Sequence, residues 1–209
     1  MLGTGGAPQT QWKLKGRHAA FLSHFKRECA MEARYFQSNL ADLLGCDVFL
    51  DSDDLTDLRK LLQHVKESDV LLLFQTKGLF TRPWCLLEVY TAVEAMVPIV
   101  TVNVKGFHPY DFEDALRCLT FLDTELEKRN PGASKLLADH GVDVVDCAHK
   151  LSSVVPNIIS VDFNPSGSRN NIMACLLDVV DSMQRAVPAE VTTTREEFLA
   201  KRGSPDDDA

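Results

Sequence analysis

Short apolar runs alternate along the first half of the chain with longer segments whose apolar residues recur at helical spacing. The runs are brief and end abruptly at polar residues, which favours buried strands. Strands are predicted at residues 17–23, 47–50, 69–74 and 98–104. Helices are predicted between them at residues 28–44, 55–65 and 83–96. Strand and helix alternating with short connections predict a parallel sheet covered on both faces.

The second half is less regular between residues 106 and 155, where a helical insert precedes the last strand. Helices are predicted at residues 110–128, 133–140 and 142–154. A strand at residues 142–145 is an alternative interpretation of the start of the 142–154 segment. A fifth strand is predicted at residues 157–163, and a final helix from a Ser168 cap through Met183.

These elements predict an α/β fold with a flavodoxin-like five-stranded parallel sheet and helices on both faces. We expect one domain at residues 17–187, a flexible N-terminal segment at residues 1–16 and a polar C-terminal tail at residues 188–209.

Charge and composition narrow the class of protein. The net charge is −8, which argues against a nucleic-acid partner. The apolar runs are too short to cross a bilayer, and the start of the chain does not resemble a signal peptide. The six cysteines are widely separated without metal-ligand spacing, which predicts reduced thiols and no metal site. We therefore expect a soluble cytoplasmic protein that binds no membrane.

A helix starting at Pro83 carries two side chains of possible chemical use. Proline favours the first helical position, and Trp84 and Glu88 then lie one turn apart on the same face. A carboxylate there could stabilise a developing positive charge, or it could be an exposed glutamate favoured by the helix dipole. For Trp84, packing in the core is the favoured interpretation, and a ligand platform is the other.

Polar residues follow the predicted strands at the edge where parallel α/β sheets bind ligands. Ser23 and His24 lead into a helix whose start carries Phe25, Lys26 and Arg27, so N–H groups and cations meet where a pyrophosphate would be favoured. A capped helix with solvated cations explains the same residues equally well. Cys85 has no histidine placed to act as its base, so the sequence does not support nucleophilic catalysis.

Three short motifs follow one another in the chain, at residues 20–24 (AFLSH), 48–55 (VFLDSDDL) and 84–88 (WCLLE). Together they resemble a TIR (Toll/interleukin-1 receptor) domain over about residues 17–187. Residues 20–24 (AFLSH) resemble its first box. Residues 48–55 (VFLDSDDL) resemble the second strand and its acidic BB loop. Residues 84–88 (WCLLE) resemble the W-C-x-x-E helix. The family's BB loop often has a glycine soon after the acidic pair, and this chain has none there.

The resemblance implies a signalling role in innate immunity, with cleavage of NAD⁺ to nicotinamide and ADP-ribose or a cyclic form. Glu88 would be the catalytic carboxylate, and NAD⁺ a substrate rather than a resident cofactor. The residues expected around the nucleotide are Ser23, His24, Phe25, Lys26 and Trp84. The family implies activity on self-association, or association with other TIR domains. The alternative is a non-enzymatic adaptor whose interaction surface is Asp51, Asp53, Asp54 and Asp57.

Overall fold

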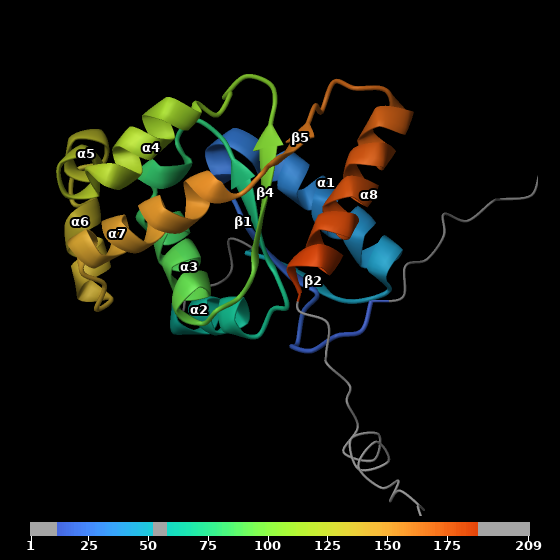
Figure 1. Cartoon of the computed structure of the whole chain (residues 1–209), viewed down its shortest axis with the longest axis horizontal. Helices are drawn as coiled ribbons and strands as arrows, with labels where there is room; N and C mark the ends of the chain where they lie inside the picture. Colours follow the sequence, from blue (N-terminus) through green and yellow to red (C-terminus); the bar gives the residue numbers. More distant parts are fainter. Residues whose placement is uncertain (1–11, 52–57, 188–209) are drawn as a thin grey trace, which may run out of the picture.

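Five parallel strands form one sheet in the computed structural model, which describes residues 12–51 and 58–187 (Figure 1). The strands are β1 (Ala20–Ser23), β2 (Val48–Leu50), β3 (Leu71–Gln75), β4 (Ile99–Val104) and β5 (Val161–Phe163). Their spatial order is β2-β1-β3-β4-β5, and every neighbouring pair is parallel. This flavodoxin-like order confirms the predicted fold class, and the direction in which successive strands are added reverses between β1 and β3.

Helices cover both faces of the sheet. Helices α1 (Lys26–Leu44) and α8 (Arg169–Ala186) pack on one face, while α2 (Leu58–Lys66) and α3 (Pro83–Glu94) pack on the other (Figure 1). A short 3₁₀ helix, η1 (Leu79–Thr81), joins β3 to α3. Each face has its own cluster of buried apolar side chains, so the sheet separates two cores.

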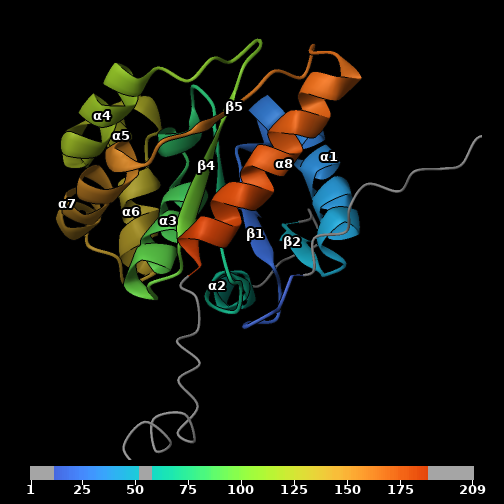
Figure 2. The same ribbon diagram turned by 45° about the vertical axis from the view of Figure 1, so that its right-hand side comes forward.

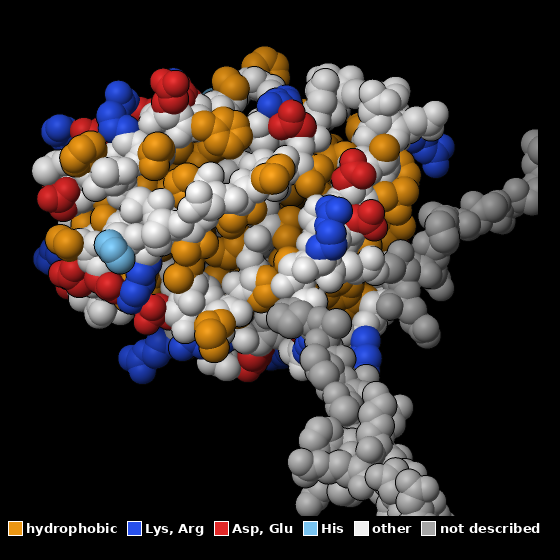
Figure 3. Space-filling view, in the orientation of Figure 1, with side chains coloured by type: hydrophobic (Ala, Val, Ile, Leu, Met, Phe, Trp, Pro, Cys, Tyr) orange, Lys and Arg blue, Asp and Glu red, His pale blue; other side chains and the backbone are white. Residues whose placement is uncertain are grey.

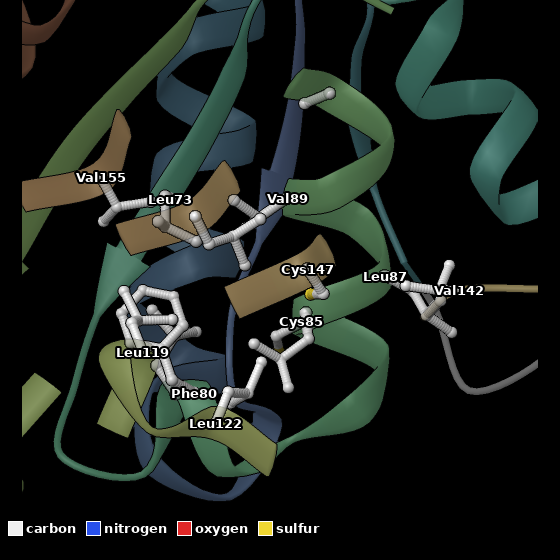
Figure 4. Close-up of a cluster of buried hydrophobic side chains, with 14 of the residues drawn as sticks. Leu73, Phe80, Cys85, Leu87, Val89, Leu119, Leu122, Val142, Cys147 and Val155 are labelled. Atoms are coloured by element: carbon white, nitrogen blue, oxygen red, sulfur yellow. The ribbon is translucent and has the colours of Figure 1, made fainter. Parts of the chain in front are cut away.

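The central strand β3 divides its apolar side chains between the two cores. Leu71 and Leu73 enter the α3 side, and Leu72 and Phe74 enter the α1–α8 side. Figure 4 shows Leu73 within the first of these clusters. All four side chains are fully buried, and each contributes roughly 1.5–3 kcal/mol relative to exposure in water. This strand was predicted from its continuous apolar run, which is typical of a strand buried on both faces.

The predicted insert folds into four helices that pack beyond α3 (Figure 2). They are α4 (Phe112–Thr120), α5 (Leu122–Arg129), α6 (Ala133–Asp139) and α7 (Val144–Val154). The single helix predicted at residues 110–128 is wrong, because the backbone at Phe121 leaves the helical region (φ −115°, ψ 41°). The strand interpretation of residues 142–145 is also wrong, since α7 begins at Val144.

The fifth strand is shorter than the predicted 157–163. Residues Val155–Asn157 form a second 3₁₀ helix, η2, and only Val161–Phe163 pair with β4. The pairing joins Val161 to Val102 and Phe163 to Val104. The predicted segment therefore contains the strand, but Asn157 belongs to η2 and residues 158–160 lie before the pairing begins.

Part of the expected flexible N-terminal segment packs on the domain. The Trp12 indole Nε1 donates a 2.8 Å hydrogen bond to the Asp69 carboxylate, and the Gly16 N–H donates to the same group at 2.6 Å. The Lys15 N–H bonds to it as well, at 3.1 Å. Residues 12–16 are thus held beside the start of β3, whereas residues 1–11 and the predicted tail 188–209 lie outside the described residues.

The six cysteines are free thiols, and all but Cys46 are buried. Among the described residues, no helix combines the length and the apolar character needed to span a bilayer.

Candidate functional site

A pocket of about 440 Å³ opens at the carboxyl ends of β1 and β2, beside the start of α3. We call it the crest pocket. Its lining residues are His24, Phe25, Lys26, Arg27, Asp51, Leu61, Arg82, Trp84, Cys85 and Glu88. The volume falls in the range of about 300–1,000 Å³ that is usual for small-molecule sites. Its position matches the edge where parallel α/β sheets bind ligands.

Glu88 lies in the inner wall of this pocket and is 5% exposed. It sits on the second turn of α3, and the Ser23 hydroxyl at the end of β1 donates a 2.5 Å hydrogen bond to its Oε2. Ser23 itself is fully buried, so its hydrogen bond holds the carboxyl from the protein interior. The interpretation of Glu88 as an exposed helix-face residue is therefore wrong.

Burial raises the pKa of Glu88 to about 8. The hydrogen bond from Ser23 lowers the pKa, the nearby charge of Asp51 raises it and that of Lys26 lowers it, but burial dominates. A carboxyl with a pKa near neutrality can take up and release a proton under physiological conditions. Perturbed carboxyls of this kind are concentrated at functional sites.

Cationic groups and two helix N-termini surround the mouth of the pocket. The N-cap residues of α1 and α3 are Phe25 and Arg82, whose side chains carry no hydrogen-bond acceptor. The dipoles of both helices favour an anion at these N-terminal ends. Lys26 Nζ lies 3.2 Å from Asp51 Oδ2, and the Arg82 guanidinium carbon lies 4.9 Å from the centre of the Phe25 ring.

Trp84 stands at the pocket and not in the core. Its side chain is 37% exposed, and its indole lies 5.6 Å from the His140 ring at the end of α6. Core packing, which the sequence favoured for this residue, is wrong. A partly exposed indole that lines a pocket can stack on a planar ligand.

The structure brings together most of the residues expected around a nucleotide. His24, Phe25, Lys26 and Trp84 line the crest pocket with Glu88, whereas Ser23 contacts the pocket only through that carboxyl. The sequence missed other lining residues, namely Leu61, Arg82 and Cys85. The position of Arg82 could have been predicted, because the residue before a helix-starting proline lies at the helix N-terminus. Leu61 could not have been predicted, since only tertiary packing brings α2 to the crest pocket.

The acidic cluster predicted as an interaction surface is divided. Asp51 lines the crest pocket and pairs with Lys26, so in this structure it belongs to the pocket. Asp53, Asp54 and Asp57 lie outside the described residues. Within the described part of the chain, no group of three metal-ligating side chains could hold an ion.

Cys85 does not have the character of a nucleophile. Its thiol is buried and lies 3.5 Å from the His24 carbonyl oxygen, to which it donates. Burial raises its pKa well above the ordinary value, and the charge of Glu88 adds to this. Reactive thiolates instead need a lowered pKa and exposure. The thiol of Cys85 is therefore a poor candidate for a reactive group in this pocket.

Comparison with known proteins places the fold. No family model matches the sequence, and no curated protein matches it by sequence. Among solved structures, the chain is similar to the TIR domains in the structure of the activated Roq1 resistosome directly recognizing the pathogen effector XopQ. The TM-score is 0.57 at 18% identity, over 79% of this chain and 99% of that one. The protein therefore has a TIR-like fold.

Proposed function

We propose that this protein is a TIR-type signalling protein that cleaves the bond between nicotinamide and ribose in NAD⁺, with Glu88 as the catalytic carboxylate. The observation that supports this best is the buried Glu88 carboxyl in the wall of a pocket whose mouth carries cations. The TIR-like fold and the pocket's place at the carboxyl ends of the strands favour the same function.

The proposed reaction begins with heterolytic cleavage of the bond between nicotinamide N1 and ribose C1′. The bonding electrons leave with the ring, so nicotinamide departs as a neutral molecule and needs no proton. The ribose becomes an oxocarbenium-like cation, which an ionised Glu88 stabilises. Water then attacks C1′ and loses a proton to give ADP-ribose, or an adenine nitrogen attacks to give a cyclic product.

Burial makes Glu88 well suited to this task. In a site that excludes water, a carboxylate interacts with a nearby positive charge more strongly than it would in solvent. The same burial disfavours the ionised form, and a cationic pyridinium beside the carboxyl would restore it. After nicotinamide leaves, a group with a pKa near neutrality can also accept the proton of the attacking water.

Other residues of the crest pocket could bind the pyrophosphate and a base of NAD⁺. Arg27, Arg82 and the first-turn N–H groups of α1 and α3 would bind the pyrophosphate. The indole of Trp84 would stack on a base. The likeness to TIR domains of an activated resistosome favours self-association as the condition for activity. We place the reaction in the cytoplasm, in a signalling pathway of the innate immune type.

The test is nicotinamide release from NAD⁺ by the concentrated 209-residue chain, with and without a crowding agent. Wild type should release nicotinamide, and Glu88→Gln and Glu88→Ala should be slower by about 100-fold or more. Glu94→Gln is the matched control, because Glu94 lies on the same helix with its side chain 49% exposed. Absence of release under every condition, or equal release by Glu88→Gln, would contradict catalysis and favour the adaptor alternative.

A further inference from the structure

The first turn of α1 is a separate piece of backbone from the rest of the helix. Cys29 has φ −151° and ψ 33°, which interrupts the helical dihedral angles after residues 26–28. The turn closes on itself, because the N–H groups of Glu28 and Cys29 both bond to the Phe25 carbonyl, at 2.9 and 3.1 Å. Phe25, Lys26 and Arg27 from this turn line the crest pocket. Contacts that fix the turn therefore fix one wall of the pocket.

The Glu28 side chain joins this turn to the loop after β3. Its Oε2 accepts the Gly78 N–H at 2.8 Å, and the side chain is only 11% exposed. His108 Nδ1 lies 3.9 Å from Oε1 of the same carboxylate. A hydrogen bond to a carboxylate that is shielded from water is among the stronger kinds in proteins. Glu28 itself does not line the crest pocket. It can therefore influence a ligand there only through the position of the residues that do.

Position 78 has no room for a side chain. A Cβ there would lie 2.8 Å from Glu28 Oε1 and 3.0 Å from Cε1 of Phe25. The backbone at Gly78 has φ −97° and ψ 4°, so glycine is needed for space and not for a left-handed conformation. The Phe25 ring thus lies against Gly78, and the Arg82 guanidinium lies over the same ring.

We propose that Glu28 is a positioning residue for the crest pocket. By accepting the Gly78 N–H, it holds the first turn of α1 against the loop after β3. This keeps Phe25, Lys26 and Arg27 where a pyrophosphate would bind. The proposal rests on the proposed function for the identity of the ligand, whereas the contact between Glu28 and Gly78 is independent of any reaction.

The test compares four variants of the full chain: Glu28→Ala, Glu28→Gln, Gly78→Ala and Glu32→Gln. Glu28→Gln keeps an oxygen that can accept the Gly78 N–H, and Glu32, one turn further on, is the matched control for charge. The first measurement is hydrogen exchange at the amides of Gly78 and of residues 25–29. The second is the Kd for NAD⁺ and for inorganic pyrophosphate by calorimetry. Where turnover occurs, the KM and kcat for NAD⁺ are added.

In Glu28→Ala and Gly78→Ala we expect exchange at these amides to be faster, and each Kd to be higher, by about tenfold or more. KM should rise by a similar factor with a smaller change in kcat. Glu28→Gln and Glu32→Gln should stay within about threefold of wild type in both measurements.

Unchanged exchange and Kd in Glu28→Ala would overturn the proposal. So would a Glu28→Gln variant as defective as Glu28→Ala, since charge and not position would then matter, or an equal loss in Glu32→Gln. A wild type that binds neither NAD⁺ nor pyrophosphate also overturns it. If wild type binds NAD⁺ without cleaving it and the variants lose binding, the proposed catalysis fails and the role of Glu28 stands.

Discussion

The Ser23 hydroxyl and the Glu88 carboxyl lie 2.5 Å apart, and their hydrogen bond joins the end of β1 to the second turn of α3. Both side chains are buried, so little solvent competes for the bond. The bond favours ionised Glu88, whereas burial favours the protonated form, and burial prevails. The protonation state of the proposed catalytic group therefore depends on a named neighbour that can be changed.

Removing the Ser23 hydroxyl should raise the pKa of Glu88 further, because the bond that lowers it is lost. In Ser23→Ala we expect kcat/KM for NAD⁺ at pH 7 to fall by about tenfold, as one pKa unit corresponds to a tenfold change in the ionised fraction. The deficit should shrink at pH 9, where more Glu88 is ionised. The measurement is nicotinamide release as a function of pH.

Ser160→Ala is the control for this experiment. Its hydroxyl is part-buried and bonds to Gln75 and Thr101, and Ser160 does not line the crest pocket. A deficit in Ser23→Ala that is equal at pH 7 and pH 9 would contradict an effect through the ionisation of Glu88.

Glu88 should also reduce the stability of the fold as pH rises. The carboxyl titrates near 4.5 in the unfolded chain and near 8 in the folded one, so between these values folding takes up a proton. The free energy of unfolding therefore falls with rising pH in this window. Glu88→Gln cannot ionise, and it should be more stable than wild type by about 3 kcal/mol at pH 7 and by little at pH 4.

Denaturant unfolding of wild type and Glu88→Gln at pH 4, 6 and 8 measures this difference. Glu94→Gln serves as the control, because it removes a half-exposed carboxyl from the same helix. A difference that stays constant with pH, or a Glu88→Gln variant that is less stable at pH 8, would contradict the raised pKa.

The charges of Asp51 and Lys26 should move the pH profile in opposite directions. The kcat/KM for NAD⁺ reports the free protein, so it should rise with pH to a plateau with a midpoint at about 8. Asp51→Asn removes a charge that raises the pKa of Glu88 and should lower the midpoint. Lys26→Met removes one that lowers it and should raise the midpoint. Shifts in the same direction would show that another group controls the profile.

Much of the fold was readable from the sequence because apolar runs identify strands in a buried parallel sheet. β3 is the clearest case, since all five of its residues are buried and the run has no polar interruption before Gln75. The helix predicted at residues 110–128 failed for a different reason. Its break at Phe121 follows from how α4 and α5 each pack against α7, and local spacing does not contain that information.

The orientation of α3 was the feature that was hardest to predict from the sequence. Its buried residues are Pro83, Cys85, Leu86, Leu87, Glu88, Val89, Thr91 and Ala92. Such a helix is enclosed on most sides, by the sheet, by α2 and by the insert, so no apolar stripe shows which polar residue faces inward. The exposure of Trp84 likewise depends on where α6 places His140. The family motif identified Glu88, but only tertiary structure shows that it is buried.

Binding of NAD⁺ should release a proton from Glu88 near neutral pH. The carboxyl is mostly protonated at pH 7 when its pKa is about 8. A pyridinium cation placed beside a buried carboxylate favours the ionised form by direct attraction. By linkage, a ligand that lowers a pKa must release protons as it binds, so its affinity rises with pH across the window below 8. The dihydropyridine ring of NADH is uncharged and supplies no such attraction.

Calorimetric titrations with NAD⁺ at pH 7, in two buffers of different ionisation enthalpy, measure the released protons directly. We expect a release of up to about one proton per NAD⁺ bound for wild type, and close to none for Glu88→Gln, which has no proton to lose. NADH should bind to wild type more weakly and without this release. Lys26→Met is a useful second comparison, because we expect loss of this cation at the pocket to weaken binding of both nucleotides while the Glu88 carboxyl stays in place. Equal proton release by wild type and Glu88→Gln would mean that another group titrates. Equal affinity for NAD⁺ and NADH would mean that Glu88 does not face the nicotinamide ring.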